Sequence, residues 1–235
     1  MGSLVEHLKV AVCEANLELQ RSGLVILTWG NVSGRDPVSG LIAIKPSGLG
    51  YDEMRPEDMV VLDIDGHVVE GALRPSSDTP THLAIYRAFE DVHGVAHTHS
   101  TYATAWAQAR RSLPCYGTTH ADSFRGAVPV TEDLTDEQIL GEYEAETGAA
   151  IVRACAGRAP LDVPAALVAG HGPFTWGRSA AHAVENSIVL EQVALTAMLT
   201  ERIAPDPRPI SATLLDKHFL RKHGAGAYYG QRDLR

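Results

Sequence analysis

The sequence of 235 residues has few cysteines and no long uncharged apolar run. Its three cysteines, Cys13, Cys115 and Cys155, lie far apart and form no CxxC pair. This argues against a disulfide framework or a thiolate metal site, and it predicts reduced thiols in a cytoplasmic protein. The longest apolar helical pattern, over residues 183–199, is interrupted by glutamates such as Glu185. We therefore expect no segment that spans a membrane.

Positive charge and nucleotide-binding glycine motifs are also lacking. The formal net charge is -9, which excludes the electrostatic footprint of a nucleic-acid or acidic-membrane binder. Neither a GxxxxGK motif nor a GxGxxG motif after a strand is present, so nucleotide binding is not indicated. The N-terminus begins directly with an amphipathic helical pattern rather than a signal peptide. The expected ligand is therefore a small molecule.

The length of the chain predicts one large domain, residues 1–235, and its hydrophobic periodicity predicts mixed helices and strands. The pair Asp65-Gly66 is a hairpin signal and so predicts antiparallel pairing. We expect a three-layer α/β/α fold with a mostly antiparallel central sheet. The predicted helices are 4–19 (ended by Gly23), 79–89, 101–110, 135–156, 179–203 and 211–222, and the predicted strands are 41–44, 59–64, 67–69, 92–98 and 165–169.

Three histidines stand where a metal centre could form. His97 and His99 leave a short apolar strand as an HxH pair, and alternate residues of a strand share one face. His171 follows another predicted strand and is flanked by two glycines. Three imidazoles with an open fourth position are typical of a catalytic zinc site. The HxH pair alone is a weak indication, because a chain with 11 histidines can contain one by chance.

Three polar segments place small hydroxyl or amide residues beside glycine or proline: 28–33, 45–48 and 75–78. We interpret them as loops whose backbone N–H groups and hydroxyls could form a concave array of donors. Such an array suits a phosphate group, and Lys45 could add a positive charge. Each segment taken singly is an ordinary turn. Together they predict a small phosphate ester as the ligand.

The order and spacing of seven segments closely resemble the class II aldolase, epimerase and adducin-like family, and within it the epimerases that act on pentulose phosphates. The resemblance runs nearly from end to end of the chain. The segments that carry it are Thr28–Ser33, Lys45–Gly48, Ser76–His82, His97–Ser100, Gly117–Asp122, His171–Phe174 and the C-terminal run from Asp216 to Gly230.

The resemblance implies a metal enzyme that interconverts L-ribulose 5-phosphate and D-xylulose 5-phosphate by retro-aldol cleavage and re-addition between carbons 3 and 4. Its metal ligands fall on His97, His99 and His171, with Asp78 as a metal-associated acid. We expect Zn²⁺, although Mn²⁺ and Co²⁺ also accept imidazole ligands. The expected substrate- and phosphate-binding residues are Gly30, Asn31, Lys45, Ser47, Gly48, Ser76 and Ser77.

Epimerisation exchanges the two faces of an aldehyde, and each face needs a proton carrier. The resemblance places these carriers at Asp122 and Tyr229, with His218 near the site. It also implies a cyclic homotetramer in which the C-terminal tail, about 211–235, reaches a neighbouring subunit's site. His120 is expected to support the structure rather than to bind the metal.

Several alternatives stay open. A class II aldolase that releases its products is the nearest one, but such enzymes usually carry Glu where this chain has Asp78. A decarboxylase acting on another sugar phosphate would use the same metal. A hydrolytic HxHxDH zinc site fails at Thr101 and Tyr102. A noncatalytic adducin-like scaffold is disfavoured, because all three histidines are present.

Overall fold

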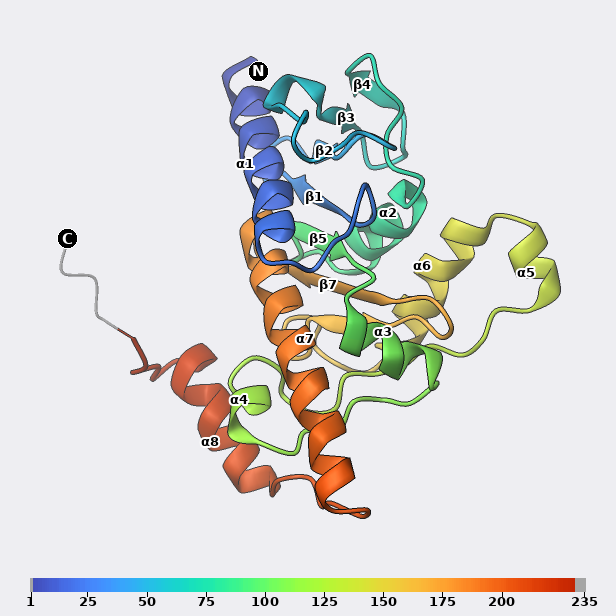
Figure 1. The fold of residues 1–235 in the computed structure, drawn as a ribbon. Coiled ribbons are helices and arrows are strands. Elements are labelled where there is room, and N and C mark those ends of the chain that lie inside the picture. Colours follow the sequence, from blue (N-terminus) through green and yellow to red (C-terminus); the bar gives the residue numbers. More distant parts are fainter. Residues whose placement is uncertain (1, 231–235) are drawn as a thin grey trace.

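Residues 2–230 are described by a computed structural model, in which seven strands form one sheet in the order β4-β3-β2-β1-β5-β7-β6 (Figure 1). Every neighbouring pair of strands is antiparallel. The predicted α/β fold with an antiparallel sheet is therefore confirmed. The strands are β1 Asn31–Arg35, β2 Ile42–Ile44, β3 Val60–Leu62, β4 Val68–Glu70, β5 Gly94–His97, β6 Ala165–Leu167 and β7 Pro173–Gly177.

Helices cover both faces of this sheet. α1 (Gly2–Arg21) and α7 (Ala180–Ile203) pack on one face, and α2 (Thr79–Ala88) and α6 (Tyr143–Ala154) pack on the other (Figure 1). The strand β5 shows the two sides clearly, because Ala96 packs with α1 and α7 whereas Val95 packs with α2 and α6. The other helices are η1 Pro56–Asp58, α3 Thr101–Gln108, α4 Thr118–Ala121, α5 Asp136–Leu140 and α8 Ala212–His223.

Capping residues define the helix starts that the sequence predicts. Ser179 Oγ accepts a hydrogen bond from the His182 N–H at the start of α7. Ser211 Oγ accepts one from the Leu214 N–H at the start of α8. The prediction of one helix over 135–156 is wrong in one respect, because the structure has two helices in this range. Thr135 caps α5 as expected, but Gly141 (φ -93, ψ -128) leaves the helical region, and α6 starts afresh at Tyr143.

Two strands were not predicted, and both flank β5. The sequence predicts a loop over residues 28–33, but β1 starts at Asn31. β7 follows directly after the turn that carries His171. β1 has a single large apolar side chain, Val32, and β7 is a five-residue segment that begins with proline, so the strand signal of each is weak. The strand predicted over 92–98 ends at His97, so His99 lies beyond it.

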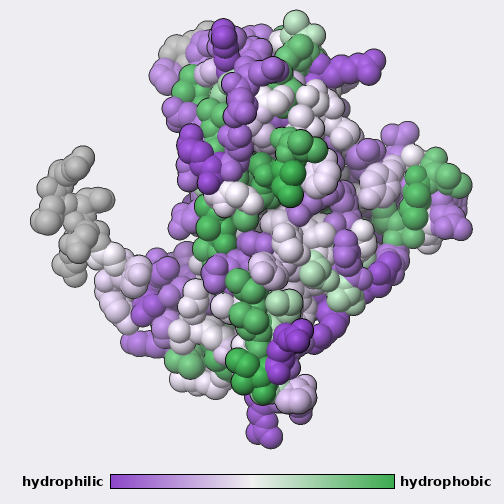
Figure 2. All heavy atoms as spheres, in the orientation of Figure 1, coloured by the Kyte–Doolittle hydropathy of each residue, from purple (hydrophilic) through white to green (hydrophobic). Residues whose placement is uncertain are grey.

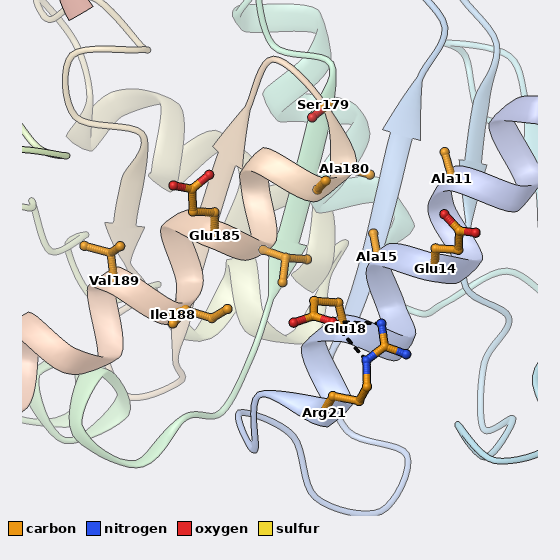
Figure 3. A pocket seen from close by; sticks show the side chains of 12 residues that line it. Ala11, Glu14, Ala15, Glu18, Arg21, Ser179, Ala180, Glu185, Ile188 and Val189 are labelled. Atoms are coloured by element: carbon orange, nitrogen blue, oxygen red, sulfur yellow. Dashed lines mark hydrogen bonds and ion pairs between the residues drawn. The ribbon is translucent and has the colours of Figure 1, made fainter. Parts of the chain in front are cut away.

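The surface outside the sheet is mixed in character. In Figure 2 apolar side chains form separate patches among polar ones, one of them over α5, where Ile139 and Leu140 are exposed. A groove of about 530 Å³ lies between α1 and α7, lined by small apolar side chains and by carboxylates such as Glu18, which pairs with Arg21 (Figure 3). No imidazole lines this groove.

Two further expectations from the sequence can be compared with the structure. No helix within residues 2–230 has an apolar stretch long enough to cross a bilayer. The cysteines Cys13, Cys115 and Cys155 are free and buried.

Candidate metal centre

The three predicted metal ligands converge at one end of β5. His97 is the last residue of β5, His99 follows two positions later, and His171 lies in the turn between β6 and β7. The Nε2 atoms of His97 and His99 are 3.0 Å apart, and those of His99 and His171 are 3.1 Å apart. Within the described residues these histidines form a set whose ligand atoms all lie within 4.8 Å of one another.

This arrangement fits a divalent metal ion. Nitrogen ligands at the zinc distance in a tetrahedron are about 3.3 Å from one another, close to the separations here. The Nδ1–H of His97 donates to the Pro173 carbonyl oxygen over 3.0 Å, so the lone pair of His97 stands on Nε2 and faces the other rings. Lone pairs that face one another in this way repel unless a proton or a cation lies between them. The histidine set can therefore hold a metal.

Burial keeps these imidazoles unprotonated. His97 is 2% exposed, and burial lowers its pKa to about 3. Burial also lowers the pKa of His99 and of His171. A metal binds the neutral form of imidazole, so all three rings are ready to act as ligands at neutral pH.

Asp78 adds a negative charge beside the histidines. It stands at the start of α2, and its Oδ2 accepts a hydrogen bond from Asn31 Nδ2 over 2.6 Å. Burial acts to raise the pKa of the Asp78 carboxyl, but the pKa lies below its usual value, and the Asn31 hydrogen bond helps to hold it there. An ionised carboxylate here favours a cation at the histidine set. Its role as a metal-associated acid stays a prediction.

The same pocket contains every residue predicted to bind phosphate. Its volume is about 440 Å³, and the three histidines are among the residues that line it. Its loops are held together by backbone hydrogen bonds, from Ser76 N–H to Lys45 O (3.0 Å) and from Ser47 N–H to Arg74 O (2.9 Å). The predicted binding residues among its lining are Gly30, Asn31, Lys45, Ser47, Gly48, Ser76 and Ser77.

Lys45 is a buried cation without an anionic partner. It is 2% exposed, and its Nζ contacts the Pro46 carbonyl oxygen at 3.4 Å and the Tyr51 ring at 4.9 Å. No carboxylate within residues 2–230 forms an ion pair with it. Burial lowers the pKa of Lys45 to about 8. The hydroxyls of Ser47 and Ser77 have no hydrogen-bond partner in the described chain, so the pocket can offer an anion several donors.

Two glycines allow the close packing behind the histidines. Gly30 has φ +76, and a Cβ there would lie 2.8 Å from the His97 carbonyl oxygen. A Cβ at Gly172 would lie 2.7 Å from the Thr98 carbonyl oxygen. The loop that carries His171 therefore packs directly against the backbone that carries His97 and His99.

Two residues of the pocket, Tyr143 and Glu144, lie outside every candidate site segment named from the sequence, and Trp29 lies in such a segment without a predicted role. The Trp29 ring lies 6.1 Å from the His99 ring, and the Tyr143 hydroxyl lies 3.3 Å from His171 Nδ1. Tyr143 and Glu144 lie within the range 135–156, for which the sequence predicts one continuous helix. The glycine at position 141 was the available signal for a break in front of them.

The predicted proton carriers form a second cluster, outside the histidine pocket. Asp122 follows α4, and its Oδ1 accepts hydrogen bonds from His218 Nδ1 and Arg221 Nε, both over 3.0 Å. The Arg221 guanidinium lies 4.9 Å from the Tyr229 ring, which is 60% exposed. Within one chain the structure brings Asp122, His218 and Tyr229 together, but not into the pocket. Their catalytic roles stay predictions.

His120 lies apart from the set formed by His97, His99 and His171. Its Nε2 donates to the Gly126 carbonyl oxygen over 2.8 Å, and burial lowers its pKa to about 4. It therefore ties α4 to the loop that follows.

Comparisons with known proteins show the family of the chain. Residues 10–198 match the family described as Class II Aldolase and Adducin N-terminal domain, and the chain belongs to this family. Over 228 residues it is 52% identical to L-ribulose-5-phosphate 4-epimerase UlaF of Salmonella paratyphi C, with 97% of this chain and 100% of that protein covered. The UlaF protein of Salmonella typhi matches to the same extent.

A solved structure of L-fuculose 1-phosphate aldolase shares the fold. It superposes with a TM-score of 0.77 at 30% identity, over 90% of this chain and 94% of that one. The resemblance to the class II aldolase and epimerase family is therefore confirmed. α8, which carries His218, lies beyond residues 10–198, the range that matches the family.

We predict that Gly172→Ala weakens metal binding. The new methyl group would meet the Thr98 carbonyl oxygen, so the His171 loop must move away from the other two ligands. We expect zinc affinity to fall about tenfold or more, measured by competition with a chromophoric chelator. Gly50→Ala is the control, because a Cβ there meets nothing within 4 Å. Equal zinc affinity in the two variants would contradict the prediction.

Proposed function

We propose that this protein is a metal-dependent epimerase that interconverts L-ribulose 5-phosphate and D-xylulose 5-phosphate. The observation that carries the proposal is one pocket that joins three converging imidazoles to an unpaired buried lysine and free hydroxyls. The 52% identity to proteins named L-ribulose-5-phosphate 4-epimerase supports this choice of substrate. We also propose a single-domain enzyme of the cytoplasm, where its free cysteines would stay reduced.

We infer that His97, His99 and His171 hold a Zn²⁺ ion, with Asp78 beside it. When bound, the ion supplies Lewis acidity for the negative charge that develops on oxygen as the bond between carbons 3 and 4 breaks. Imidazole ligands also accept Mn²⁺ and Co²⁺. The protein's part is to keep the three rings neutral and in place, which burial and the Pro173 hydrogen bond do.

The phosphate end of the pocket has a separate task. Cleavage of the bond leaves a three-carbon fragment and glycolaldehyde phosphate, and the aldehyde must turn over before the bond forms again. We propose that Lys45, Ser47 and Ser77 hold the phosphate during this turn, so that the fragment does not escape. Because the phosphate is attached through carbon 5, rotation about the bond between carbons 4 and 5 can exchange the aldehyde faces while the phosphate stays bound.

The rotation of the aldehyde requires two proton carriers, one on each side of the aldehyde plane. Cleavage removes the proton of the carbon-4 hydroxyl, and re-addition to the other aldehyde face creates an alkoxide that takes up a proton there. We propose that Asp122 and Tyr229 act in these roles, with His218 close by. Since they lie outside the pocket of their own chain, a neighbouring subunit of a homotetramer would supply them.

Cleavage without re-addition is the alternative function. The fold likeness to L-fuculose 1-phosphate aldolase, at 30% identity, is the observation that favours it. The presence of Asp78 in place of the glutamate expected of such aldolases favours the epimerase.

We expect the purified protein to convert L-ribulose 5-phosphate to D-xylulose 5-phosphate, followed by a coupled assay for both isomers. Removal of the metal with a chelator should lower the rate at least about 100-fold, because the developing charge loses its Lewis acid. Added Zn²⁺ should restore the rate. Net accumulation of dihydroxyacetone and glycolaldehyde phosphate without the epimer would identify an aldolase instead.

Lys45→Met should weaken binding of inorganic phosphate about 10- to 100-fold at pH 7.5, because a charge-assisted hydrogen bond is lost. In the wild type, affinity should fall as the pH rises above about 8, where the Lys45 ammonium loses its proton. The Lys45→Met variant should not show this fall. Calorimetric titration at pH 7.5 and 9.5 measures both effects.

The control for this test is Lys9→Met. Lys9 is also buried but is paired with Glu70 at 2.8 Å, far from the pocket lining. Its loss should lower stability and leave phosphate affinity unchanged. If Lys45→Met bound phosphate as tightly as Lys9→Met does, the proposed anion site would be wrong.

Tyr229→Phe should lower turnover while zinc content stays at the wild-type level. If Tyr229 serves a neighbouring pocket, mixing this variant with His97→Asn chains should regenerate activity, because some interfaces then pair an intact pocket with an intact tyrosine. Random reassembly would restore about a quarter of the sites. Refolded mixtures that are no more active than either variant alone would place Tyr229 outside the neighbouring site.

A further inference from the structure

Two of the three converging histidines have a hydrogen-bond partner at Nδ1. His97 donates to a backbone carbonyl oxygen, that of Pro173, at 3.0 Å. His171 faces a side chain instead, the Tyr143 hydroxyl, at 3.3 Å, and the two rings are tilted by 33° with centroids 6.3 Å apart. His97 is also fixed by stacking on Phe174 within the sheet, whereas His171 lies in a turn. The orientation of His171 thus depends more on its side-chain partner.

The position of Tyr143 is set by the packing of α6 on α2. A Cβ at Gly148 would lie 2.5 Å from Ala84 Cβ, so the two helices approach as closely as a glycine permits. Thr81 Oγ1 donates to the Glu144 carbonyl oxygen over 2.6 Å, which ties the first turn of α6 to α2. Thr147 Oγ1 donates to the Tyr143 carbonyl oxygen over 2.8 Å. The position of the Tyr143 hydroxyl is therefore set by α2 and α6 rather than by the loop that carries His171.

The direction of the hydrogen bond follows from the proton that a neutral imidazole carries. His171 Nε2 faces His99 Nε2 at 3.1 Å, and a nitrogen that binds a metal must carry no proton. The single ring proton then stands on Nδ1, where the Tyr143 oxygen can accept it. If the tyrosine donated instead, the proton would move to Nε2 and block the metal side of the ring.

We propose that Tyr143 is a positioning residue, whose hydroxyl oxygen accepts the Nδ1–H of His171 and so keeps the Nε2 lone pair directed at the metal position. The inference rests on the proposed metal centre. Partners of this kind orient metal-bound histidines, and their loss typically costs 10- to 100-fold in metal affinity. The role also explains why α6 begins with a side chain that lines the pocket.

The test uses Zn²⁺ alone and the full chain. Apoprotein of the wild type, Tyr143→Phe and Tyr116→Phe is titrated with zinc in competition with a chromophoric chelator. Tyr116→Phe is the matched control, because it removes a hydroxyl that donates to Glu201 (2.9 Å) away from the pocket. Tyr143→Phe should raise the zinc Kd about tenfold or more, and Tyr116→Phe should leave it within about twofold of the wild type.

A second measurement reports on the imidazole itself. In zinc-loaded wild type, nitrogen NMR of the histidine rings should show a slowly exchanging Nδ1–H on His171, and in Tyr143→Phe this proton should exchange faster. Equal Kd values and equal exchange in the two proteins would overturn the role of Tyr143 while leaving the metal centre intact. Failure of the wild type to bind one zinc per chain would overturn the proposed metal centre and this inference with it.

Discussion

The site depends on the pairing of β5 between β1 and β7. In this register His97 stands opposite Asn31 on one side and opposite Phe174 on the other. Asn31 directs the Asp78 carboxylate, and Phe174 stacks on the His97 ring at 4.1 Å. Because β7 begins immediately after the His171 turn, the same pairing brings the third imidazole to the end of β5. A shift of register by one residue would turn His97 to the other face of the sheet.

Burial then determines the chemistry of two groups in the pocket. It lowers the pKa of the imidazoles, so that neutral nitrogens face one another beside an ionised Asp78. It also leaves the Lys45 ammonium without a counter-ion among residues 2–230. The histidine set favours a cation, and Lys45 favours an anion. This charge pattern would suit the proposed sugar phosphate, which offers oxygens to a metal and a phosphate to the lysine.

The α4 and α8 cluster is built on a different principle. Two hydrogen bonds of 3.0 Å and one of 2.6 Å converge on the Asp122 carboxylate from α8. They hold the carboxylate pKa below its usual value, although burial acts to raise it. α8 and Asp122 are thereby coupled, so residues that were predicted to act together also lie together. The proposed assembly would bring this cluster, as a unit, to the pocket of another chain.

The capped helices, the antiparallel hairpin and most of the pocket residues could be predicted from the sequence. Caps and turns depend on local chemistry, and the pocket residues stand in segments whose order and spacing resemble those of the family. The sequence could not show β1 and β7. Their polar or proline-containing segments become strands only because β5 lies between them and supplies hydrogen bonds along both edges. The place of Tyr143 beside His171 depends on the close packing of α6 against α2, which joins segments far apart in the chain. Which nitrogen of His97 and of His171 faces the pocket is likewise set by the fold, because their Nδ1 partners lie 76 and 28 residues away in the chain.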